Sequence, residues 1–112
     1  MSSDNLDIEG LIKEKEKELL DLTFECVKRG NDAEIGIREK YDLKINDLRD
    51  QMVKAPDKET IDSIYNKIKS LEKQKIREIK KRRKEIDKEM KAQINTLNHE
   101  LKDLYKKSSI RR

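Results

Sequence analysis

The chain has 112 residues, of which 33% are hydrophobic, 4% aromatic and 46% charged, with a formal net charge of +4. This length supports one domain at most, and so few large apolar side chains cannot fill the centre of a compact globule. Dense charge in a sequence rich in Glu, Lys, Leu and Ile is typical of long helices or of disorder, and the periodicity of the apolar residues favours helices.

The first predicted helix covers about residues 5–54. Apolar residues recur along it every three or four positions, which places them on one face of an α-helix. A helix this long with such a narrow apolar face needs a partner along its length. The members of this face are Ile8, Leu11, Ile12, Leu19, Leu22, Cys26, Ile37, Tyr41, Ile45, Leu48 and Met52.

A glycine-containing segment, residues 29–36, interrupts this first arm. Gly30 fits a helix C-cap, and Asn31 with Glu34 three residues later fits a capping box. The apolar residues on both sides of the segment nevertheless keep one offset against the second half of the chain. This favours a kink or break near Gly30 within one arm, although the sequence leaves a true loop open. The alternative is a three-helix arrangement of residues 5–29, 32–54 and 57–107.

The only proline, Pro56, lies near the middle of the chain. Proline cannot continue a helix interior and moves the preceding residue away from helical angles, so we predict a turn at residues 55–57. Asp57 can then cap a second helix. This second helix is predicted to cover about residues 57–107 and to be followed by a frayed tail at 108–112.

The second helix carries an apolar face of the same period as the first. When the chain folds back at the proline, Leu48 falls opposite Ile64 and, at the same offset, Cys26 falls opposite Ile86. We therefore predict one all-α domain over residues 1–112, a long antiparallel coiled-coil helical hairpin. The members of the second face are Ile61, Ile64, Ile68, Leu71, Ile76, Ile79, Ile86, Met90, Ile94, Leu97, Leu101 and Leu104.

The sequence contains no residue pattern typical of enzyme chemistry. One histidine, His99, and one cysteine, Cys26, are too few to form a metal site. The three glycines follow neither the dinucleotide-binding nor the P-loop spacing. We therefore expect no catalytic, cofactor-binding or metal-ligating residue, no small-molecule substrate and no enzymatic activity.

The sequence shows neither a signal peptide nor a membrane-spanning stretch. The N-terminal residues have neither the basic flank nor the apolar run of a signal peptide, and no apolar stretch approaches the ~18 residues that span a bilayer. A single cysteine cannot form an internal disulfide. We expect an intracellular protein, cytoplasmic or nuclear, with no membrane span.

Charge is distributed unevenly along the chain. Residues 1–56 carry 10 basic and 14 acidic side chains and residues 57–112 carry 18 and 10, which together make the 28 basic and 24 acidic residues of the chain. The basic excess is concentrated in residues 73–91. This stretch fits a solvated or partner-facing helix surface, a low-specificity contact for nucleic-acid phosphates, or an import or anionic-membrane signal. The candidate contacts for nucleic acid or an acidic partner are Lys80, Lys81, Arg82, Arg83 and Lys84.

Four apolar residues, Leu20, Phe24, Leu43 and Val53, lie off the two apolar faces. A two-helix coil buries each helix on one side only, so these residues are candidate contacts for a partner helix. The preferred function is that of a non-enzymatic interaction or assembly protein, a structural adaptor or a subunit of a larger complex. Its expected partner is a second copy, as a homodimer, or another helical protein. The alternative is a protein that associates with nucleic acid, on a ribosome or chromosome, through residues 73–91.

Overall fold

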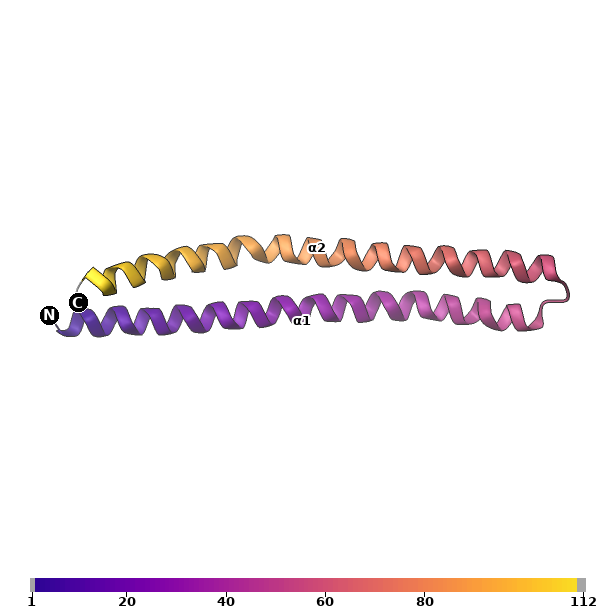
Figure 1. Ribbon diagram of the computed structural model, residues 1–112. Helices are drawn as coiled ribbons and strands as arrows, with labels where there is room; N and C mark the ends of the chain where they lie inside the picture. The colour runs from indigo at the N-terminus through magenta and orange to yellow at the C-terminus, as the bar shows by residue number, and fades with distance from the viewer. Residues whose placement is uncertain (1, 111–112) are drawn as a thin grey trace. The chain divides into compact units, whose positions relative to one another are not determined.

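The computed structural model describes the backbone of residues 2–110 and the side chains of residues 7–108. Over these residues the chain forms two α-helices, α1 (Ser2–Lys54) and α2 (Lys58–Ile110). The helices run antiparallel and are joined by one short turn (Figure 1). The prediction of an all-α helical hairpin is confirmed.

The turn forms as its sequence predicts. Asp57 accepts a hydrogen bond from the backbone N–H of Thr60 through its Oδ1, at 2.7 Å, which satisfies one of the unpaired donors at the start of α2. The hydrogen bonds from Thr60 also lower the pKa of the Asp57 carboxyl. The end of α1 is closed by a bond from the Ala55 N–H to the Met52 carbonyl, at 3.3 Å. Pro56, which has no N–H, lies between these two caps.

The helices extend slightly beyond their predicted bounds. Helix α1 begins at Ser2, before the predicted start at residue 5. Helix α2 continues to Ile110, so it includes most of the predicted tail. Residues 111–112 of that tail lie outside the described residues.

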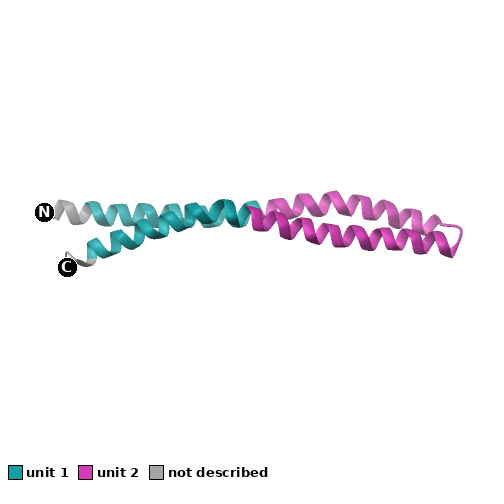
Figure 2. Ribbon diagram, turned by 90° about the horizontal axis from the view of Figure 1, so that it is seen from above, with its two compact units in different colours: residues 1–29, 86–112 teal, residues 30–85 magenta. Residues whose placement is uncertain are grey.

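The hairpin consists of two compact units, residues 1–29 with 86–112 (unit 1) and residues 30–85 (unit 2) (Figure 2). In each unit a segment of α1 packs against a segment of α2. Unit 1 buries Ile86, Met90 and Leu101. In unit 2, Tyr41, Ile45, Ile64 and Ile68 form one buried cluster, with Ile37, Leu48, Met52, Ala55 and Leu71 packed against it, and Ile79 is buried as well.

Helix α1 is continuous through Gly30, so the predicted break and the three-helix alternative are both wrong. No glycine among the described residues has a positive φ, which a C-cap at Gly30 would require. Gly30 is buried, and the Nη1 atom of Arg83 lies 2.9 Å from the position that a Cβ at Gly30 would occupy. The glycine therefore gives space to a side chain of the facing helix, while the chain stays helical. The predicted kink is not confirmed.

Replacing Gly36 with alanine is expected to raise the free energy of unfolding by about 0.5–1 kcal/mol, because alanine is the better helix former. Nothing lies within 4 Å of the new Cβ at this position. The same change at Gly30 is expected to give a smaller gain or none, since its Cβ displaces the Arg83 guanidinium. Urea unfolding followed by far-UV circular dichroism measures both changes. A larger gain at Gly30 than at Gly36 would contradict the role given to Gly30.

Candidate functional site

The predicted basic cluster of α2 divides around the helix. Lys80, Lys81 and Lys84 are exposed, whereas Arg82 and Arg83 are partly buried. Arg82 pairs with Glu85 of its own helix, with 3.3 Å between Nη1 and Oε2. Five consecutive residues cover more than one turn of an α-helix, so they cannot all lie on one surface. Lys80, Lys81 and Lys84 therefore face solvent. Among the ion pairs of the described side chains, none involves these three lysines.

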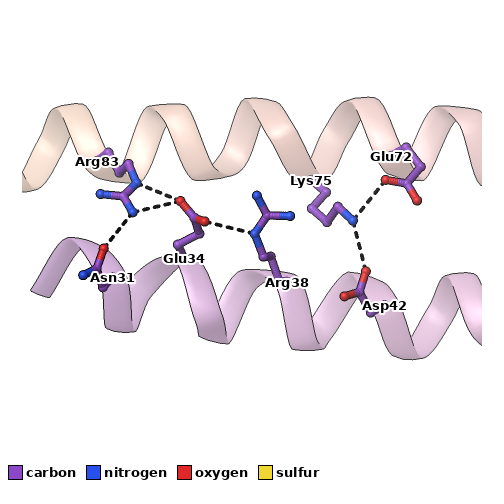
Figure 3. Close-up of polar contacts among 7 residues, drawn as sticks. All are labelled: Asn31, Glu34, Arg38, Asp42, Glu72, Lys75 and Arg83. Carbon is purple, nitrogen blue, oxygen red and sulfur yellow. Dashed lines mark hydrogen bonds and ion pairs between the residues drawn. The ribbon is translucent and has the colours of Figure 1, made fainter. Parts of the chain in front are cut away.

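Arg83 points across the seam between the helices (Figure 3). Its Nε donates to Oε1 of Glu34 at 2.9 Å, and its Nη2 donates to Oδ1 of Asn31 at 3.1 Å. Glu34 also accepts a hydrogen bond from Nε of Arg38 at 3.0 Å. Hydrogen bonds from Arg38 and Arg83 hold the pKa of the Glu34 carboxyl below its usual value. The guanidinium of Arg83 is thus engaged within unit 2 and beside Gly30.

Lys75 occupies a buried position in the seam of unit 2, with only 9% of its side chain exposed. Its ammonium pairs with Oε2 of Glu72 and with Oδ1 of Asp42 on α1, each at 3.0 Å (Figure 3). The hydrogen bonds to Glu72 and Asp42 raise the pKa of Lys75. Lys75 was not predicted, because the apolar period assigned this seam position to Ile76, which is 48% exposed. The spacing of four residues between Leu71, Lys75 and Ile79 could have identified it.

A third polar contact crosses the seam at Tyr41. Its hydroxyl donates to Oε2 of Glu78 at 2.6 Å, while its ring belongs to the core of unit 2. This hydrogen bond raises the pKa of the tyrosine and lowers the pKa of the Glu78 carboxyl. The ammonium groups of Lys40 and Lys44 lie 5.2 and 5.8 Å from the ring centroid. Glu78 is therefore directed toward the seam and engaged there.

All four apolar residues predicted to lie off the seam are exposed. Leu20 and Phe24 are 56% and 67% exposed, and Leu43 and Val53 are 74% and 85% exposed. The structure adds Val27, which is 56% exposed. Leu20, Phe24 and Val27 follow one another at the spacing that places side chains on a single helix face. We call these three residues of unit 1 the α1 stripe; Leu43 and Val53 belong to unit 2.

The cysteine and the histidine of the described residues lie on different helices, Cys26 on α1 and His99 on α2. The half-buried Cys26 thiol donates to Oδ1 of Asp87 at 3.6 Å, and burial together with this contact raises the pKa of the thiol. His99 is exposed on α2. Over the residues whose side chains are described, no three His, Cys, Asp or Glu residues converge to hold a metal ion.

Each unit also carries an open groove along its seam. The groove of unit 2 has a volume of about 520 Å³ and includes Ala33, Gly36 and Ile37. The groove of unit 1 has a volume of about 470 Å³ and includes Leu22 and Leu97. All other residues that line the two grooves are polar or charged. In the groove of unit 1, the Thr96 hydroxyl donates to the Ala92 carbonyl at 2.9 Å.

Within the described range, neither helix has a segment long and apolar enough to cross a membrane. The comparisons with known proteins give no relative from which a role could be transferred. The sequence matches no protein-family description, no curated protein and no solved structure.

Proposed function

We propose that the chain is a non-enzymatic assembly protein, a structural adaptor or subunit that associates with other helices through the α1 stripe. The observation that carries this proposal is the exposure of Leu20, Phe24 and Val27 on one face of a helix whose opposite face already packs against α2. Large apolar side chains that lie singly on a surface are ordinary, whereas a row at helical spacing is typical of a helix-packing surface.

The chemistry around the α1 stripe suits a second helix. Its residues are spaced by four and then three positions, which is the spacing of the apolar residues through which helices pair in coiled coils. Lys17, Asp21 and Lys28 flank it and are exposed, so the stripe has charged neighbours of both signs. Burying a phenylalanine side chain contributes roughly 1.5–3 kcal/mol. Leu20 and Val27 contribute on the same scale, and the sum over both partners has to exceed the roughly 4–15 kcal/mol that association costs in lost translational and rotational freedom.

A second copy of the chain is the first partner to test, because each copy presents the same stripe. Sedimentation equilibrium at tens of micromolar is expected to give a dimer mass for the unsubstituted chain. Phe24→Glu is expected to give a monomer, since the dimer would have to bury a carboxylate in an apolar contact. Far-UV circular dichroism should show unchanged helicity for this variant.

Leu43→Glu is the matched control, because it places the same charge at an exposed leucine of α1 outside the stripe. This variant is expected to remain dimeric. A monomeric mass for the unsubstituted chain with full helicity would overturn self-association through the stripe. Equal dissociation by Phe24→Glu and Leu43→Glu would show that added charge, and not loss of the stripe, separates the copies.

A further inference from the structure

The outer face of α2 in unit 2 carries a regular row of cations. Lys69, Lys73, Arg77, Lys80 and Lys84 follow one another at steps of four, four, three and four residues. With 3.6 residues per turn, these steps keep all five side chains on one face of the helix. All five are exposed. We call these five residues the basic ladder.

The basic ladder faces away from α1. Lys73 and Arg77 each lie two residues from the buried Lys75, which turns them by about 200° around the helix axis from the seam. Lys80 follows the buried Ile79 directly, and so lies about 100° from it. The ladder therefore differs from the run of consecutive basic residues in the sequence, since it omits the inward-pointing Arg83.

The acidic side chains of this segment do not neutralise the basic ladder, because they are engaged on the seam side. Glu72 pairs with Lys75 and with Arg49. Glu78 accepts a hydrogen bond from Tyr41 and pairs with Lys40. Among the ion pairs of the described side chains, none involves Lys73, Arg77, Lys80 or Lys84. The outer face thus presents charge of one sign.

The length and spacing of this row suit a linear polyanion. From Lys69 to Lys84 the helix rises by roughly 22 Å, with one cation about every 5–6 Å. A nucleic-acid strand in a duplex carries one phosphate about every 3.4 Å along the helix axis, so a strand of this length presents several phosphates to the ladder. Side-by-side cations repel one another, and an anionic polymer relieves that repulsion while it releases its own counterions.

An acidic protein helix fits this face less well. Helices pair through a row of apolar side chains between their charges, whereas Ile76 is the one exposed apolar side chain between Lys69 and Lys84. A phosphate backbone requires positive charge and no apolar seam. One aromatic side chain lies beside the ladder, Tyr65, which is 48% exposed and has its ring centroid 4.9 Å from Nζ of Lys69. A single ring cannot stack a run of bases, so the contact of the ladder is with the backbone and carries no sequence information.

We propose that the basic ladder binds the phosphate backbone of nucleic acid without preference for base sequence. This site lies on α2 in unit 2, whereas the α1 stripe lies in unit 1, so either proposal can fail while the other stands.

The test is a fluorescence-anisotropy titration of the full chain with labelled single-stranded RNA and duplex DNA of mixed sequence, at several salt concentrations. With four or five phosphate contacts, the slope of log K against log salt is expected to be about −3 to −3.5 for the single strand. Lys73→Gln with Lys80→Gln should reduce the magnitude of that negative slope by about 1.4 and weaken binding about 25-fold near ~0.1 M salt. Glutamine has nearly the helix propensity of lysine, so helicity should be unchanged.

Lys102→Gln with Lys106→Gln is the matched control, because it removes the same charge from two exposed lysines of α2 outside the ladder and the stripe. This control is expected to weaken binding less than threefold and to leave the slope unchanged. The absence of salt-dependent binding near physiological ionic strength would overturn the proposal. Equal weakening by both double variants would overturn it too, since net charge alone would then explain binding. Binding to phosphatidylserine vesicles together with failure to bind either nucleic acid would also overturn the proposal.

Discussion

Replacing Ile45 with alanine is expected to lower the free energy of unfolding by about 2–4 kcal/mol. Ile45 is 1% exposed and belongs to the buried cluster of unit 2 with Tyr41, Ile64 and Ile68. Truncation removes the contacts of the lost methyl and methylene groups with Tyr41, Ile64 and Ile68. Domains are commonly stable by only about 5–15 kcal/mol, so this change removes a large share of the total.

Urea unfolding followed by far-UV circular dichroism measures the effect, and Leu43→Ala provides the matched control. Leu43 lies two residues away on the same helix and is 74% exposed, so its truncation is expected to change stability by less than about 0.5 kcal/mol. Equal losses for Ile45→Ala and Leu43→Ala would contradict the packing described for unit 2.

The double variant Asp42→Asn with Glu72→Gln removes both acidic partners of Lys75. It is expected to lower the free energy of unfolding by about 2 kcal/mol. Breaking a fully buried ion pair costs roughly 3–5 kcal/mol, because it leaves a charge without compensation. The side chains of Asp42 and Glu72 are 52% and 38% exposed, so water already weakens their attraction and the expected loss is smaller. The ammonium of Lys75 would remain at a position where only 9% of its side chain is exposed.

Adding Lys75→Met to the same double variant is expected to recover most of the lost stability. Methionine has a similar length, fills the seam and carries no charge, so the cost of a buried unpaired ammonium disappears. Chemical unfolding of the unsubstituted chain and of the double and triple variants measures this recovery. If the triple variant is no more stable than the double variant, the loss would come from Asp42 and Glu72 themselves and not from the uncompensated lysine.

The pH dependence of this contact has a defined sign. Glu72 and Asp42 raise the pKa of Lys75 in the folded chain. Their contribution to stability is therefore fully present below the ordinary lysine pKa, and it is lost as the pH rises through the higher folded value. The contact contributes throughout the neutral range.

Two features of the sequence were enough to predict the hairpin. The apolar period of the two halves specified long helices, and the single proline specified where the chain reverses. The break near Gly30 was predicted incorrectly, because the local capping signals of this segment do not show what the facing helix places beside it. A glycine that ends a helix and a glycine that admits a guanidinium from a neighbour look the same in one sequence. Only the position of Arg83 distinguishes them.

The candidate surfaces were predicted only in part, because the sequence does not show which side of each helix faces its neighbour. Exposure of Leu20 and Phe24 followed from their distance to the apolar face, and Val27 was missed because it directly follows Cys26 of that face. The side of α2 on which each basic residue lies depends on the rotation of the helix in the hairpin. Hydropathy assigned the seam position to Ile76, whereas the packing places Lys75 there with two carboxylates.

The proline turn also restricts how two copies of the chain combine. Helical hairpins exchange arms between molecules by straightening their connection, so that both arms become one continuous helix. Straightening at residues 55–57 would place Pro56 inside a helix, at a cost of about 3 kcal/mol or more, and would remove the cap that Asp57 gives to Thr60. Arm exchange is therefore disfavoured, and association of intact hairpins is left as the lower-energy route to a dimer.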